Sequence, residues 1–185
     1  MRFRETGLPG AYLVEIEPHA DERGFFARTW CEREFGAQGL AARMVQASVS
    51  FNRKKGTLRG LHFQTAPRRE ARLVRCVAGA TFNAIVDLRS RSPTYLKHFT
   101  TLLSAENHAA LYVPPGFALG FQTLAPDTEV FYQMSEFHEP AAARGLRWND
   151  PVFGIEWPDD NRTILERDAT YADFDPAAVA GFASY

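Results

Sequence analysis

The sequence predicts an all-β protein whose strands form a jelly-roll (cupin-like) barrel or sandwich with a few short helices. Apolar and polar residues alternate in short runs rich in Val, Phe, Tyr and Thr, which is typical of half-buried strands. Turn residues separate these runs, and helix-like stretches are sparse. The chain of 185 residues is 45% hydrophobic and 13% aromatic, which suffices for one core. A barrel of this kind has a mouth that holds one small ligand.

Eight runs along the chain have the length and composition of strands. They span residues 11–18, 44–52, 57–64, 71–88, 98–105, 109–116, 120–125 and 129–137. We expect Gly79 to turn a hairpin within the longest run, and Pro114-Pro115-Gly116 to make a sharp bend between two others. Short helices are expected at 31–40 and 176–183. Since no linker or repeat interrupts the chain, we expect one domain over residues 1–185 with a small-residue tail from about residue 175.

Composition excludes several classes of partner. The formal net charge of −1 gives no global attraction to nucleic acid or to an anionic membrane, so any anion site must be built locally. Cys31 and Cys76 stand in no metal-ligand or redox spacing, and both are expected to be reduced. The N-terminus has no apolar core and no window approaches eighteen apolar residues, so neither a signal peptide nor a membrane span is predicted. We therefore expect a cytoplasmic protein.

The segment GTLRGLHFQ, residues 56–64, places a histidine on an interior strand. A lone strand histidine is more often a structural residue than a catalytic one. Metal-binding barrels of this kind use a His-x-His pair, but residues 60 and 64 are Gly and Gln and the other histidines show no ligand spacing, so no metal site is predicted. Strand parity places Gly60, His62 and Gln64 on one face, a set that is poor as core and more typical of a pocket wall.

Arg59 would point away from this pocket on a regular strand. A β-bulge reverses the alternation, and glycine is the residue that most readily permits one. The sequence therefore predicts a bulge at Gly60 that brings Arg59 to the same face as His62.

Seven segments spread along nearly the whole chain are informative together: DERGFFARTW, KKGTLRGLHFQ, RLVRCVAGATFNAIVDLR, SPTY, LYVPPGFALGFQTL, RGLRWNDPVFGIEWP and ILERDA. In this order they resemble the dTDP-4-dehydrorhamnose 3,5-epimerase family, isomerases that act on nucleotide-linked 4-keto sugars. The resemblance implies a jelly-roll cupin barrel, a homodimer with exchanged strands, and a nucleotide-sugar substrate with no metal or organic cofactor. It also implies epimerisation of a dTDP-4-dehydro-6-deoxyglucose-type sugar at C3, C5 or both, in deoxysugar biosynthesis of the rhamnose type.

The resemblance assigns three catalytic roles. His62 of the RGLH motif matches the family's base, which removes a proton from carbon next to a ketone. Asp168 of ERDA matches the carboxylate that orients this imidazole and stabilises its charged form. Read alone, Asp168 would be a solvated turn or helix-cap residue. Tyr132 matches the acid that returns a proton from the opposite side, although by itself it would be an ordinary barrel aromatic.

Further positions match family contacts to the nucleotide sugar. Arg23 and Arg59 occupy the diphosphate positions, where planar guanidinium groups suit phosphate geometry, and Arg23 is expected to reach across the dimer. Gln46 matches a polar position of the site, and Phe26 is expected to contact the nucleotide.

The chain departs from the family pattern near the substrate. Arg72 replaces the usual lysine, Leu119 a histidine, Ser48 an asparagine, and Phe137 and His138 an aromatic pair. These departures leave open a monoepimerase, or an enzyme for another sugar or nucleotide. A non-catalytic nucleotide-sugar-binding homologue is the second class of function, but it would be expected to lack the base, carboxylate or acid, and all three are present. A different cupin isomerase or oxygenase is disfavoured by the missing metal ligands.

Overall fold

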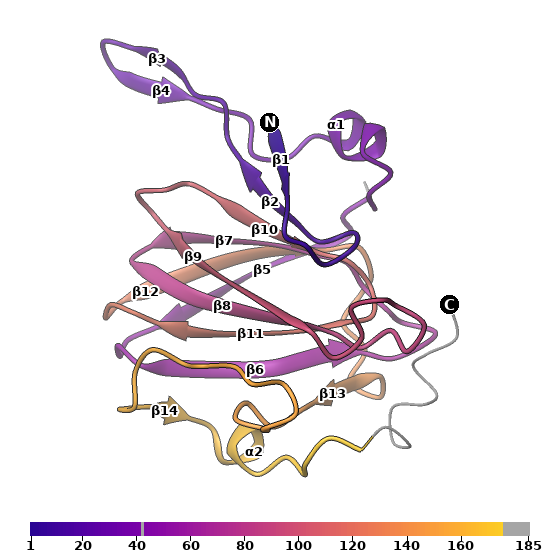
Figure 1. Ribbon diagram of the computed structural model, residues 1–185. Helices are drawn as coiled ribbons and strands as arrows, with labels where there is room; N and C mark the ends of the chain where they lie inside the picture. The colour runs from indigo at the N-terminus through magenta and orange to yellow at the C-terminus, as the bar shows by residue number, and fades with distance from the viewer. Residues whose placement is uncertain (42, 176–185) are drawn as a thin grey trace.

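A computed structural model describes residues 1–41 and 43–175, and within them the chain forms two opposed sheets, one two-stranded hairpin and two short helices (Figure 1). The first sheet has the order β1 (Arg2–Glu5), β2 (Tyr12–Glu15), β10 (Ala110–Val113), β7 (Arg72–Ala78), β12 (Thr128–Met134) and β5 (Gln46–Asn52). The second has the order β13 (Ala143–Gly145), β6 (Thr57–Gln64), β11 (Phe117–Thr123), β8 (Ala80–Asp87) and β9 (His98–Ser104), and β14 (Thr163–Ile164) also pairs with β6. The predicted jelly-roll fold is confirmed.

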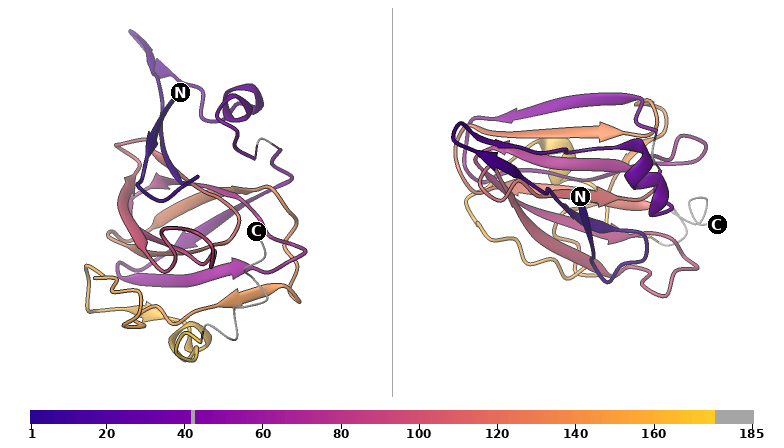
Figure 2. Two further views of the ribbon diagram at one scale, coloured as in Figure 1. Left: turned by 45° about the vertical axis from the view of Figure 1, so that its right-hand side comes forward. Right: turned by 90° about the horizontal axis from the view of Figure 1, so that it is seen from above.

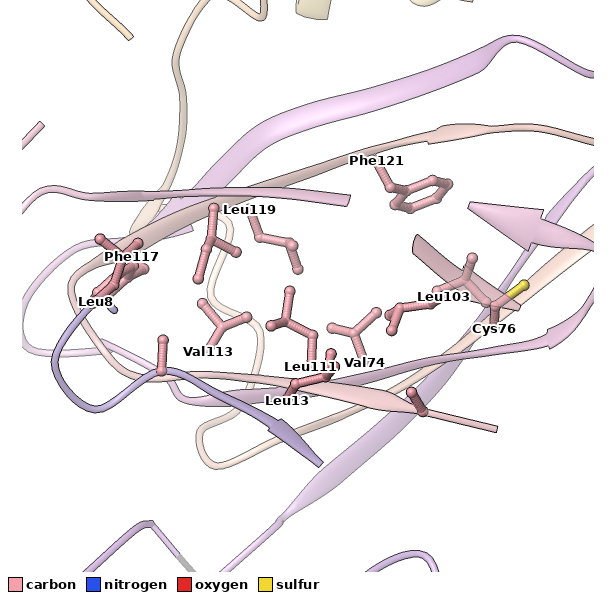
Figure 3. Close-up of a cluster of buried hydrophobic side chains, with 14 residues drawn as sticks. Leu8, Leu13, Val74, Cys76, Leu103, Leu111, Val113, Phe117, Leu119 and Phe121 are labelled. Atoms are coloured by element: carbon pink, nitrogen blue, oxygen red, sulfur yellow. The ribbon is translucent and has the colours of Figure 1, made fainter. Parts of the chain in front are cut away.

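One main core fills the space between the two sheets. The first sheet contributes Leu13, Val74 and Leu111, and the second contributes Leu119 and Phe121 (Figure 3). These are the inward members of alternating strands, so the sequence pattern that predicted strands also selects the core. None of the helices within the described residues is long and apolar enough to cross a membrane.

Connections between strands correct one expectation. Gly79 turns the chain with a φ of 72°, but β7 and β8 belong to different sheets, so the expected hairpin is wrong and Gly79 marks a corner between sheets. The Pro114–Gly116 bend is confirmed and likewise leads from one sheet to the other. The helix expected at 31–40 is present as α1 (Glu32–Ala37). The helix expected at 176–183 and the tail lie outside the described residues.

The hairpin formed by β3 (His19–Asp21) and β4 (Gly24–Phe26) projects from the body of the two sheets (Figures 1 and 2). All six of its strand residues are exposed, including Phe25 and Phe26. We call residues 19–26 the arm. Two strands alone bury little apolar surface, and Phe25 of the arm also contacts His108 of the same chain, with 5.0 Å between ring centroids.

Candidate active site

A β-bulge on β6 sets the first feature of the site. Leu119 of β11 pairs with His62, whereas Phe121 pairs with Arg59, so β6 carries one extra residue between these pairs. Gly60 lies there with a φ of 127°, and a Cβ at this position would be 2.4 Å from the Cα of Gly120. Only glycine fits both constraints.

The bulge reverses the strand's alternation. Arg59 and His62 both line the same cavity, while Leu58 and Leu61 are buried in the hydrophobic cluster on the other side of β6. The predicted bulge is therefore confirmed, and it brings a cation and an imidazole to one wall.

His62 is paired with a buried carboxylate. Its Nε2 lies 3.0 Å from Oδ1 of Asp168, which belongs to α2 (Glu166–Ala169) and is 2% exposed. Arg167 donates through Nε to Oδ1 at 3.1 Å, and the Gly60 amide donates to Oδ2 at 3.4 Å. Burial alone would raise the pKa of Asp168, but the hydrogen bonds from these donors outweigh it and the pKa is lowered.

The ionised state of Asp168 fixes the histidine's hydrogen. A carboxylate only accepts hydrogen bonds, so Nε2 of His62 carries a hydrogen, and in the neutral imidazole Nδ1 is the nitrogen with the lone pair. The solvated-turn interpretation of Asp168 is wrong, and the site contains an oriented imidazole with a free basic nitrogen.

The cavity has a volume of about 590 Å³ and lies between the two sheets' strands. Its walls include most of the residues predicted from the sequence: Gln46, Ser48, Arg59, His62, Arg72, Leu119, Tyr132 and His138. Tyr132 comes from β12 of the first sheet, whereas His62 comes from β6 of the second, so the predicted acid and base lie on different walls. A ligand between the sheets would be accessible to both.

Arg72 is held in the cavity wall by a buried glutamate. Its Nε donates to Oε1 of Glu70 at 2.7 Å, its Nη2 also contacts this carboxylate, and its Nη1 donates to the carbonyl oxygen of His62 at 3.0 Å. A guanidinium group has five N–H donors, so two remain for a ligand. The ion pair with Glu70 therefore holds the Arg72 guanidinium group in one position in the cavity wall.

Residues 5–175 match the family model for dTDP-4-dehydrorhamnose 3,5-epimerase. The chain belongs to this family. A relative from Sinorhizobium fredii, dTDP-4-dehydrorhamnose 3,5-epimerase, is 39% identical over 171 residues, which cover 92% of this chain and 88% of the relative. The protein is thus an isomerase of the epimerase type.

Solved structures resemble the epimerase closely. The dTDP-4-dehydrorhamnose 3,5-epimerase of Bacillus anthracis, with TDP and PPi bound, has a TM-score of 0.90 and 36% identity and covers 94% of this chain and 99% of its own. The Legionella pneumophila enzyme in complex with dTDP-4-keto-L-rhamnose has a TM-score of 0.92 and 28% identity over 100% and 98%. The 3′-monoepimerase ChmJ from Streptomyces bikiniensis, in complex with dTDP-quinovose, has a TM-score of 0.86 and 28% identity over 96% and 90%.

Two predicted contact residues of this epimerase lie apart from its cavity. Arg23 and Phe26 belong to the arm, and neither lines the cavity of its own chain. Arg23 instead donates to Asp21, with Nη2 2.6 Å from Oδ2, and Phe26 is 74% exposed.

Among the cavity residues that the sequence did not predict are three charged side chains and a tyrosine: Glu70, Arg144, Arg167 and Tyr171. Glu70 and Arg72 are two apart in an extended segment, a spacing that places both on one face and could have indicated the ion pair. Arg144 begins RGLRWNDPVFGIEWP and Arg167 lies within ILERDA, so position in these motifs is the signal that could have indicated them, whereas Tyr171 lies just beyond α2 and outside the motifs.

Proposed function

We propose that this epimerase acts on a nucleotide-linked 4-keto-6-deoxy sugar of the dTDP-4-dehydro-6-deoxyglucose type, inverting C3, C5 or both. The observation that carries the proposal is the buried Asp168 behind His62, facing a cavity that also contains Tyr132. An oriented neutral imidazole suits the removal of a proton from carbon next to a ketone.

The first step is proton abstraction. Nδ1 of His62 takes the proton from the ring carbon. The C–H electron pair forms a double bond to the carbonyl carbon, and the carbonyl π electrons move onto oxygen to give an enolate. Asp168 stabilises the imidazolium that forms, because it accepts from Nε2 within a buried site. The two spare N–H groups of Arg72 supply donors for the enolate oxygen, and Glu70 keeps them in place before the reaction.

The second step returns a proton to the opposite face of the same carbon. Tyr132 supplies it from β12, and the enolate electron pair forms the new C–H bond. Inversion follows because the proton leaves toward one sheet and returns from the other. The imidazolium of His62 then releases its proton to solvent, and the Tyr132 phenolate takes one up from solvent.

Arg59 is the proposed diphosphate contact within the chain. Its Nε donates to Oδ1 of Asn52 at 2.8 Å, and the amide of Asn52 donates to the carbonyl oxygens of Ser50 and Thr128 at 3.0 and 3.1 Å. This support leaves the terminal guanidinium nitrogens for two phosphate oxygens. Gln46 and Ser48 of β5 add polar contacts.

We infer a homodimer in which the arm of one protomer reaches the cavity of its partner, so that Arg23 and Phe26 complete the partner's nucleotide site. The arm's exposed aromatic side chains support this, since a projecting hairpin gains stability by packing against another surface. The first sheet also exposes Val49, Phe51 and Val77 to solvent.

Mixing two inactive variants tests whether the arm of one protomer completes the cavity of its partner. Arg23→Ala and His62→Ala protomers should regain activity in mixed dimers, because one cavity then has His62 and receives the unmodified arm. If the arm served its own chain, both cavities of the mixed dimer would stay defective. A monomeric mass by light scattering would also refute the dimer.

A narrower epimerase specificity is the second candidate, and Leu119 supports it. This apolar side chain pairs with His62 across the strands, where the family pattern has a histidine. A missing polar contact would weaken one of the two epimerisations more than the other.

Incubation with dTDP-4-keto-6-deoxyglucose in deuterated water, followed by NMR and mass spectrometry, decides between these candidates. Deuterium at two carbons supports 3,5-epimerisation, and deuterium at one supports a monoepimerase. No exchange would refute the assignment for this substrate. His62→Ala is the control, and it should show no exchange.

A further inference from the structure

Tyr171 lies beside the base without belonging to any strand. It follows α2, three positions after Asp168, and it lines the cavity. Its ring and that of His62 lie edge to face, with 6.4 Å between centroids and 81° between planes. The same short segment therefore supplies the carboxylate behind the imidazole and an aromatic ring against it.

Gly145 provides the space for this ring. Gly145 of β13 pairs with His62 of β6, and a Cβ on it would lie 2.1 Å from Cε2 and Cζ of Tyr171 and 2.5 Å from the hydroxyl oxygen. Gly145 is absent from the described glycines with positive φ, so the backbone would tolerate another residue. The contact with Tyr171 is therefore what requires glycine at this position.

The hydroxyl of Tyr171 is available to a ligand. Among the described residues it makes no hydrogen bond, although it lies at a cavity wall. Burial raises its pKa, the charge of Arg167 opposes this and that of Asp168 adds to it, so the hydroxyl stays protonated and can donate. Polar groups in such positions ordinarily find a partner in ligand or water.

We propose that Tyr171 contacts the sugar and determines which sugar the epimerase accepts. Its ring covers one edge of His62. Its hydroxyl donates a hydrogen bond to an oxygen substituent of the hexose, near the carbon that His62 deprotonates. The proposal rests on the proposed function and adds a specificity-determining residue to it. Tyr132 lies on the other sheet, so the two tyrosines contact the sugar from different walls.

The binding of two unreactive ligands measures the contact between Tyr171 and the sugar without any turnover. The affinities of dTDP and of dTDP-glucose, which lacks the ketone, are measured by calorimetry, and their ratio gives the contribution of the sugar. Tyr171→Phe removes only the hydroxyl and should lower this ratio about fivefold to tenfold, with the affinity for dTDP unchanged. Gly145→Ala displaces the ring and should lower the ratio at least as much.

Matched controls are available in the same chain. Tyr95→Phe removes a hydroxyl away from the cavity, and Gly36→Ala adds a methyl group in α1 where nothing lies within 4 Å. Both should keep the wild-type ratio and the thermal midpoint. The midpoints of the two test variants establish that they are folded.

The kinetic measurement distinguishes failure of the proposal from failure of the proposed function. With the 4-keto substrate, Tyr171→Phe should lower kcat/KM about tenfold, mainly through KM. Ratios within twofold of wild type in both Tyr171→Phe and Gly145→Ala would overturn the proposal, whatever the turnover. Absence of exchange in the wild type would instead overturn the proposed function, while the binding ratio still decides the role of Tyr171.

Discussion

Replacing Asp168 by Asn removes one buried negative charge while preserving the size of the side chain. The carboxylate now accepts from His62 and Arg167 at Oδ1 and from the Gly60 amide at Oδ2, so all its partners are donors. An amide has one acceptor and one donor end and cannot satisfy this set. With its oxygen toward Gly60, its NH₂ group faces Nε2 of His62, and the imidazole must then carry its hydrogen on Nδ1.

Either orientation of the amide impairs the base. If the hydrogen moves to Nδ1, that nitrogen cannot take a proton, a failure that costs about 10⁴-fold in a comparable histidine–carboxylate pair. If the amide oxygen instead stays toward His62, the tautomer survives but the imidazolium loses a charge-assisted hydrogen bond worth roughly 1.5–3 kcal/mol, or about 10- to 100-fold. We therefore expect kcat/KM to fall by a factor between about 10 and 10⁴. In the second orientation the Gly60 amide loses its acceptor, which should lower the free energy of unfolding by about 1–3 kcal/mol.

The assay is the rate of deuterium incorporation into the 4-keto sugar, with the affinity for dTDP measured in parallel. Asp160→Asn is a matched control, since Asp160 is fully exposed and its carboxylate binds only the nearby Arg162 among the interactions described. The control should retain wild-type exchange. If Asp168→Asn keeps more than a third of the wild-type rate with its fold intact, the dyad does not orient the base and the reasoning is refuted.

Three further outcomes follow from the same contacts. Since the pKa of Asp168 is lowered on folding, its stabilisation is present above its unfolded pKa of about 4 and is lost below it, so the thermal midpoint of Asp168→Asn should fall less than wild type on acidification from pH 6 to 3. Glu70→Gln leaves the Arg72 guanidinium without its carboxylate, and should lower the free energy of unfolding by about 1–3 kcal/mol in urea titrations and lower kcat, since Arg72 is the proposed donor to the enolate oxygen. Gly60→Ala adds a Cβ 2.4 Å from the Cα of Gly120, and should cost at least about 2 kcal/mol in the same titrations, whereas Gly36→Ala should not.

The alternation of apolar and polar residues predicted most of the central strands, because half-buried strands impose that period on the sequence. It missed β1, β3, β4, β13 and β14, which are two to four residues long and too short to show a period. The error at Gly79 has a different origin. A glycine with positive φ indicates a turn, but pairing partners are set by contacts far along the chain, and a jelly roll sends successive strands to opposite sheets.

In the site, too, local features were predictable from the sequence and tertiary contacts were not. The bulge at Gly60 was predictable because its cause is local: a glycine between an arginine and a histidine on one strand. The partnership of His62 with Asp168 joins residues 106 positions apart, so no spacing rule could indicate it and only the family resemblance did. Glu70 and Tyr171 escaped both approaches, because neither lies in a motif that carries the resemblance and each gains its role from a tertiary contact.

On the proposed function, the bulge lets one strand contact both the diphosphate and the sugar of the substrate. Arg59 and His62 pair with β11 residues two positions apart, which corresponds to about 7 Å along the strand. A phosphate held by Arg59 and a sugar carbon next to His62 can therefore belong to one ligand lying along β6. On a regular strand without the bulge, residues three positions apart point to opposite faces, so one of these two side chains would point into the core beside Leu61, and the cavity would lose either its cation or its imidazole. Binding and proton abstraction thus depend on the same glycine, which is why Gly60→Ala should lower the affinity for dTDP as well as the rate of exchange.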